Sequence, residues 1–144
     1  MAQIRLATHG DLVQLLDLIS PYQSPAFNWN ENAFRNEFNF SQTWVLAEAD
    51  EVQAFVCLRD SIEAWEISIL ATKSIYLQQG LMEALLKDLI ERFNRERHIW
   101  LEVHEDNLPA QKLYEKLGFR CDGRRGGYYS DGSAAKLYSL SKKS

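Results

Sequence analysis

The sequence predicts one α/β domain over residues 1–144, with a mixed, mostly antiparallel sheet flanked by helices. A length of 144 residues suits a single hydrophobic core. Hydrophobic residues make up 46% of the chain, which supplies enough apolar surface for that core. Short strand-like runs joined by tight turns indicate an antiparallel meander, and segments with helical spacing lie before and after it. No linker, repeat or low-complexity segment divides the chain.

The first forty residues predict a strand and two helices. Residues 3–7 alternate polar and apolar side chains, as a short strand does. Thr8 and Asp11 have the spacing of a capping box, and leucines recur at helical spacing behind them, so we expect a helix over residues 10–20. After a loop with two prolines, Asn30 is suited to cap a second helix.

The centre of the chain predicts three strands and then the clearest helix. The strands are expected over residues 43–48, 52–59 and 64–72. Gly80 opens the helix, in which apolar side chains form two adjacent rows. A stripe of that width is typical of a helix packed on a sheet.

The last third predicts a strand, a helix and a hairpin. The strand covers residues 99–104, Pro109 suits the first turn of the helix, and Gly118 suits its C-terminal cap. Residues 119–125 and 135–141 are expected to form the final hairpin. The predicted order is therefore β-α-α-β-β-β-α-β-α-β-β.

Composition limits the classes of function. A net charge of −4 and a pI near 5.4 argue against a nucleic-acid partner and favour a cationic one, such as a basic peptide. No 18-residue apolar run is present, so no membrane association is expected. Cys57 and Cys121 lack metal-ligand spacing and are expected as free thiols in half-buried strands, while His9, His98 and His104 form no evident site. With no pattern of a signal peptide, these features predict a metal-free protein of the cytoplasm.

The loop before the longest helix could bind an anion. Residues 76–80 connect a strand to the helix, and unpaired amides at a helix start attract phosphate, which glycine allows to approach the backbone. Many ordinary helices also begin after a glycine, so the loop alone does not decide the matter.

Residues 101–119 carry the most informative motif. Their sequence, LEVHEDNLPAQKLYEKLGF, resembles the C-terminal half of the GNAT acetyltransferases, and Gln78-Gln79-Gly80-Leu81 resembles their pyrophosphate loop at the expected separation. Residues 27–34, with Phe, Trp and Phe, and residues 124–129, with Arg-Arg and Tyr-Tyr, are similar to the bacterial ribosomal-protein alanine N-acetyltransferases. The resemblance covers nearly the whole chain. It implies the GNAT fold, acetyl-CoA as cosubstrate, no metal, a protein N-terminus as acceptor, and a monomer or homodimer.

The resemblance also implies roles for individual residues. Acetyl transfer needs a neutral amine, although amines are mostly protonated near neutral pH. The resemblance makes Glu102 the general base that removes the proton and Tyr114 the general acid that protonates the leaving thiolate. The expected coenzyme contacts are the side chain of Asn107, the backbone of Leu70, Ala71 and Thr72, and the loop residues Gln78, Gln79, Gly80, Leu81 and Met82. The expected acceptor contacts are Trp29, Phe34, Tyr128 and Tyr129.

Each of these residues also has a simpler interpretation. Strand alternation could turn Glu102 towards solvent, and Tyr114 could be a core aromatic residue. Asn107 could be an ordinary residue at a helix start. Trp29 and Phe34 lie five positions apart and need not share a face, so either could serve packing alone. Successive strand residues point to opposite sides, so at most one of the two tyrosines, at positions 128 and 129, should line an acceptor groove.

The chain departs from the family pattern in the pyrophosphate loop. Leu77 stands where the family has a polar residue, and Met82 stands where it has a small one. A methionine there occupies space near the pyrophosphate, although its flexible side chain can move aside. These two changes keep open the alternative of a catalytically silent module that binds a coenzyme or a partner. An acetyltransferase of small amines also stays open, because one fold can serve many acceptors.

Overall fold

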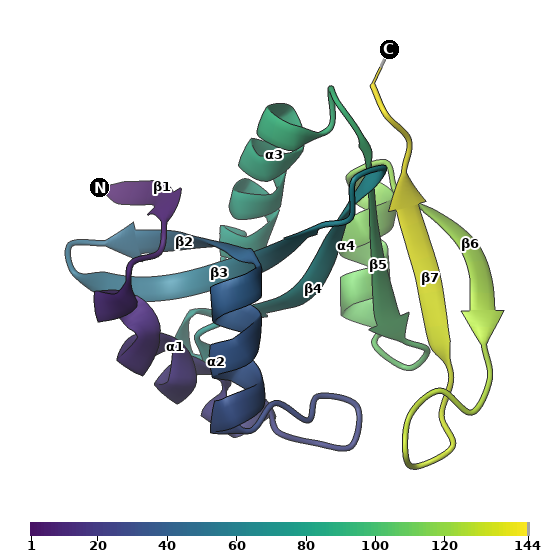
Figure 1. The fold of residues 1–144 in the computed structure, drawn as a ribbon, viewed down its shortest axis with the longest axis horizontal. Helices are drawn as coiled ribbons and strands as arrows, with labels where there is room; N and C mark the ends of the chain where they lie inside the picture. Colours follow the sequence, from purple (N-terminus) through teal and green to yellow (C-terminus); the bar gives the residue numbers. More distant parts are fainter. Residues whose placement is uncertain (144) are drawn as a thin grey trace.

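The computed structural model describes residues 1–143, which form one seven-stranded sheet covered by helices (Figure 1). The elements follow the predicted order: β1 (Ala2–Leu6), α1 (Leu12–Ile19), α2 (Glu31–Phe40), β2 (Gln42–Glu48), β3 (Glu51–Asp60), β4 (Ala64–Thr72), α3 (Leu81–Phe93), β5 (His98–His104), α4 (Leu108–Lys116), β6 (Arg120–Arg125) and β7 (Ala135–Leu140). The strand order across the sheet is β1-β2-β3-β4-β5-β7-β6, and every pairing except that of β4 with β5 is antiparallel. The predicted α/β fold class is confirmed.

Local sequence signals account for the helix starts. The backbone N–H of Thr8 donates to Oδ2 of Asp11 at 2.8 Å, which completes the predicted capping box. The helix itself starts later than predicted, because His9–Asp11 form a 3-10 turn before α1. Oδ1 of Asn30 accepts the backbone N–H of Ala33 at 2.8 Å and caps α2 as predicted.

Two apolar cores lie on opposite faces of the sheet. On one face, α3 and α4 pack through Leu85, Leu89 and Tyr114 onto strand residues that include Trp65 and Leu101. On the other face, α1 and α2 pack on the central strands through the residues Leu15, Ile19 and Phe34. β4 contributes to both cores, with Trp65 and Ile67 in the first and Ile69 and Ala71 in the second, because the pairing of β3 with β4 shifts register between them. The buried residues of β5 all belong to the first core.

The sheet opens between β4 and β5. These two strands pair in parallel only from Ala64↔His98 to Ile67↔Leu101. Beyond that point β4 stays paired with β3, while β5 stays paired with β7. The C-terminal half of β4 therefore has a backbone edge that is not covered by its neighbour in the sheet, and the end of β5 lies across the gap (Figure 1).

The two cysteines differ from expectation. Cys57 is completely buried beside Thr43, and burial raises the pKa of its thiol to about 11. Cys121 is exposed. Both are free thiols as predicted. The prediction that each lies in a half-buried strand is wrong, because β3 is central and covered on both faces whereas β6 is the exposed sheet edge. Throughout residues 1–143 no helix has the length and apolar character needed to span a bilayer, and no trio of His, Cys, Asp or Glu side chains is grouped to hold a metal.

Candidate active site

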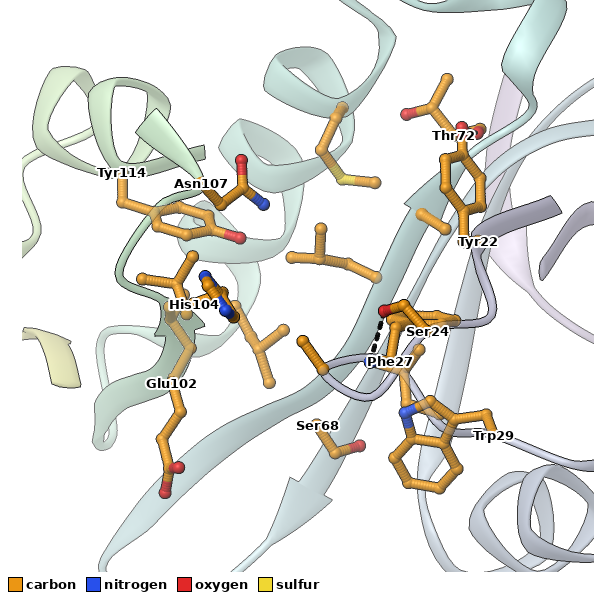
Figure 2. Close-up of a pocket in the computed structure, with 18 of the residues that line it drawn as sticks. Tyr22, Ser24, Phe27, Trp29, Ser68, Thr72, Glu102, His104, Asn107 and Tyr114 are labelled. Atoms are coloured by element: carbon orange, nitrogen blue, oxygen red, sulfur yellow. Dashed lines mark hydrogen bonds between the residues drawn. The ribbon is translucent and has the colours of Figure 1, made fainter. Parts of the chain in front are cut away.

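A cleft of about 630 Å³ occupies the opening between β4 and β5 (Figure 2). Its walls come from both strands, the loop before α2, the start of α3, the inner face of α4 and the loop after β6. The predicted site residues that line it are Trp29, Leu70, Ala71, Thr72, Met82, Glu102, Asn107, Tyr114, Tyr128 and Tyr129. Residues far apart in the chain therefore meet here, as the resemblance implied.

Phe34 does not belong to this cleft. It is fully buried under the sheet and packs edge-on against Phe55, with 5.7 Å between the ring centroids. The helix α2 begins between Trp29 and Phe34, so Trp29 stays on the preceding loop while Phe34 turns into the core. The prediction that Phe34 contacts the acceptor is corrected to a packing role.

Glu102 faces the cleft from β5. Its neighbours Leu101 and Val103 are buried in the α3–α4 core, and alternation turns the carboxylate to the opposite side. Only 15% of its side chain is exposed, and Oε2 is buried without a hydrogen-bond partner among residues 1–143. Oε1 lies 3.7 Å from Nη1 of Arg125. A buried carboxylate oxygen without a donor is costly, so this position suits a ligand that brings one.

Tyr114 enters the cleft from α4. Its ring packs between Phe119 and Tyr138, with centroid distances of 5.9 and 6.0 Å, and its hydroxyl points into the opening (Figure 2). Burial raises the pKa of the Tyr114 hydroxyl well above its usual value. The group therefore keeps its proton at neutral pH and can act as a hydrogen-bond donor.

The edge of β4 and the start of α4 form one end of the cleft. Leu70, Ala71 and Thr72 line it beyond the last paired residues, and the hydroxyl of Tyr22 donates to the Thr72 carbonyl at 2.5 Å. Asn107 caps α4 by accepting the Ala110 N–H at 3.3 Å, so the residue does serve at a helix start as well as lining the cleft.

The loop before α3 has the geometry of an anion site. Gly80 caps the helix with a φ of +76°, and a Cβ at this position would have no neighbour within 4 Å. The free space and the unpaired amides of the first turn fit a phosphate group. Gln78, Gln79, Gly80 and Leu81 lie outside the lining of the cleft, whereas Leu77 and Met82 line it. Met82 is partly buried and packs against the core under α3.

Sequence reasoning missed several polar residues of the cleft. His104 lies on the same face of β5 as Glu102, two positions further on, and strand alternation could have identified it. Glu66 lines the cleft from β4, where it pairs with Trp100 of β5, and burial together with the Glu102 charge raises the pKa of its carboxyl. Arg59 and Ser68 also line the cleft and bind the buried carboxylate of Glu37, a long-range contact with no local signal.

An opened sheet with a free strand edge, a helix start with room for an anion, and a carboxylate and a tyrosine in one cleft suit acyl transfer from an extended, phosphate-bearing donor. The acetyltransferase (GNAT) family matches residues 12–119, and the chain belongs to this family. Its class is therefore that of an N-acetyltransferase with acetyl-CoA as donor.

Relatives and solved structures agree with this assignment. The chain is 32% identical over 107 residues to the [ribosomal protein bS18]-alanine N-acetyltransferase of Escherichia coli (strain K12), which covers 72% of each chain. The crystal structure of the ribosomal-protein-S18-alanine N-acetyltransferase from Escherichia coli superposes with a TM-score of 0.88 at 27% identity, covering 100% of this chain and 96% of the other. Arabidopsis thaliana NAA60 in complex with acetyl-CoA shares the fold, with a TM-score of 0.84 at 20% identity, covering 97% and 99% of the two chains.

Proposed function

We propose that this chain moves the acetyl group of acetyl-CoA to the N-terminal α-amine of a protein, with alanine as the terminal residue. The buried Oε2 of Glu102 carries the proposal: it has no hydrogen-bond partner in the described part of the chain, so it offers an arriving ammonium group a charge partner inside the cleft. The similar bS18-alanine N-acetyltransferases support an alanine terminus. A ribosomal-protein acceptor would place the reaction in the cytoplasm.

The residues present fit the coenzyme. The free edge of Leu70, Ala71 and Thr72 offers backbone groups to the amides of the pantetheine arm, in the manner of an added strand. The helix start at Gly80 would hold the pyrophosphate, and Asn107 would contact the arm from the other side. When bound, the coenzyme supplies an activated thioester carbonyl.

Glu102 and Tyr114 divide the proton transfers between them. Glu102 takes a proton from the acceptor ammonium, so that the amine nitrogen can attack the thioester carbonyl carbon and form the new C–N bond. A backbone N–H at the β4 edge can stabilise the negative charge that develops on the carbonyl oxygen. As the C–S bond breaks, Tyr114 donates its proton to the leaving sulfur, for which its protonated state at neutral pH is suited.

The acceptor end of the cleft suits a peptide. Trp29 on the loop before α2 and the tyrosines at 128 and 129 on the loop after β6 are aromatic walls on separate segments. Both tyrosines line the cleft because they lie in a loop and not in a strand, which corrects the expectation that only one would do so. Glu66 and Glu102 bring two carboxylates to this end, beside the guanidinium groups of Arg59 and Arg125, and offer a cationic terminus opposite charges.

A direct assay tests the proposal. The protein is incubated with acetyl-CoA and a short peptide that begins with alanine, and the acetylated position is located by mass spectrometry. Both peptides contain one internal lysine, and the control peptide has the same sequence with a blocked N-terminus. We expect acetylation of the free α-amine alone. Acetylation of small polyamines but of no peptide would contradict the proposed acceptor, and the absence of acetyl-CoA binding would contradict catalysis altogether.

A further inference from the structure

His104 occupies a central place in the cleft that the two proton-transfer roles do not explain. It follows Glu102 by two residues on β5, so both side chains leave the strand on the same face. Figure 2 shows its imidazole between Tyr114 and the carboxylate of Glu102. An imidazole in this position invites a catalytic interpretation, which its hydrogen bonds do not support.

Both ring nitrogens of His104 are already engaged. Nδ1 accepts the backbone N–H of Asp106 at 3.0 Å, so a neutral ring carries its proton on Nε2. Nε2 lies 2.8 Å from Oγ of Ser133 and donates to it, and Ser133 donates in turn to the carboxylate of Asp131. Because both nitrogens are engaged, neither offers a free lone pair to a group in the cleft. The ring is therefore placed to hold a neighbouring segment and not to accept a proton.

What it holds is the loop of residues 126–133 between β6 and β7. Most residues of this loop are exposed, so apolar burial does little to fix it. Within the loop, Tyr129 N–H donates to the Ser133 carbonyl at 3.1 Å, and Gly132 N–H donates to the Tyr129 carbonyl at 2.9 Å. The loop is thus a small closed unit, and Ser133 connects that unit to β5 through His104.

The same histidine sets the position of the Tyr129 ring. The two rings are stacked, with centroids 5.1 Å apart and an interplanar angle of 23°. Tyr129 is the less exposed of the two loop tyrosines and lines the cleft. One side chain therefore fixes both the backbone of the loop and the aromatic surface that the loop presents.

We propose that His104 is a positioning residue that holds the 126–133 loop through Ser133 and Asp131, so that Tyr129 forms a fixed wall at the acceptor end. The identity of the acceptor rests on the proposed function, but the order of the loop does not. If the 126–133 loop and the Tyr129 ring are mobile, they have to be ordered each time an acceptor binds. The entropy cost weakens acceptor binding and leaves the proton transfers intact.

Two substitutions at His104 test the hydrogen bonds of its two ring nitrogens separately. His104→Asn keeps an acceptor near the position of Nδ1 but loses the donor to Ser133, whereas His104→Gln places an amide N–H near the position of Nε2. Ser133→Ala removes the partner. Ser130→Ala is the matched control, because Ser130 is an exposed serine of the same loop.

The steady-state constants for the peptide distinguish the roles. For His104→Asn and Ser133→Ala we expect the peptide KM to rise about 3- to 10-fold, the usual effect of one lost hydrogen bond, with kcat and the acetyl-CoA KM nearly unchanged. His104→Gln and Ser130→Ala should stay close to the unsubstituted protein. The double variant His104→Asn with Ser133→Ala should be no worse than either single variant, because both remove the same bond.

Hydrogen exchange supplies a readout that needs no substrate. The amides of Tyr129 and Gly132 should exchange faster in His104→Asn and Ser133→Ala than in Ser130→Ala, even if the peptide is not acetylated at all. Unchanged exchange in these variants would overturn the positioning role. A fall in kcat at constant KM would overturn it as well and would assign His104 to the chemistry. A peptide that is not turned over by the unsubstituted protein would count against the proposed function alone.

Discussion

At the scale of single residues, the proposed base and the proposed acid lie in different environments. Glu102 is partly buried, and its Oε2 has no hydrogen-bond partner within residues 1–143, whereas Tyr114 is packed by two aromatic rings and keeps its proton. Alternation alone could have placed Glu102 in solvent, but the opening of the sheet makes the polar face of β5 a cleft wall. The exposure of the Glu102 side chain therefore depends on where β4 separates from β5, which the sequence around Glu102 does not show.

Glu102→Gln should reduce kcat by about 10²- to 10⁴-fold near neutral pH, because the amide cannot accept the proton of the acceptor ammonium. Part of the activity should return at high pH, where a larger fraction of the amine is already neutral in solution. The measurement is kcat/KM for the alanine peptide over a range of pH. Full activity with an unshifted profile would give the deprotonation to another group.

Tyr114→Phe should lower kcat strongly while the affinity for acetyl-CoA stays the same. The phenyl ring keeps the packing against Phe119 and Tyr138, so only the hydroxyl that faces the cleft is lost. Calorimetric titration with acetyl-CoA, beside kinetic measurements, separates the two effects. An unchanged rate would remove the general-acid role.

At the scale of elements, the starts of α1 and α3 meet different requirements. The turn before α1 serves stability alone: Asp11 is buried, caps the turn through Thr8 and binds Arg5 at 2.8 Å. The start of α3 is proposed to hold the coenzyme phosphates, because Gly80 leaves open space around its backbone. Two substitutions distinguish these uses.

Asp11→Asn should lower the free energy of unfolding by about 1–2 kcal/mol at neutral pH. The Arg5 guanidinium first, and the Thr8 backbone N–H with it, lowers the pKa of the Asp11 carboxyl below its unfolded value. A lowered pKa stabilises the fold above the unfolded pKa, and that contribution is lost as pH falls through the folded pKa. Urea unfolding should therefore show a difference between the two proteins at neutral pH that shrinks below about pH 4. A difference independent of pH would contradict the ion pair.

Gly80→Ala should weaken acetyl-CoA binding by about tenfold or more, because the new Cβ enters the space expected for the pyrophosphate and φ of +76° strains the backbone. Acetyl-pantetheine, which lacks the phosphates, is the matched ligand. Its affinity should change little in this variant. Equal weakening of both ligands would mean that the substitution disturbs the cleft and not a phosphate site.

At the scale of the whole molecule, the elements were predictable and their long-range arrangement was less so. Periodicity and caps fixed the helices and strands closely, because those signals lie within a few residues of each other, as at Asn30 and the start of α2. The cleft depends on where β4 and β5 stop pairing after Ile67↔Leu101, and no short-range pattern marks that point. Phe34 was misplaced because its partner Phe55 is distant in the sequence, whereas the position of His104 on the face of β5 that carries Glu102 could have been inferred from strand alternation. The resemblance to a known family supplied the remaining site residues.

The short pairing of β4 with β5 also bears on how turnover would be regulated. Under the proposed function, the free strand edge and the helix start at Gly80 contact the pantetheine arm and the phosphates, which spent coenzyme A retains after transfer. The product would therefore compete with the donor for nearly the same contacts, and only the two-carbon acyl group would distinguish them. The rate in a cell would then follow the ratio of acetylated to free coenzyme, which couples this modification to the supply of acetyl groups.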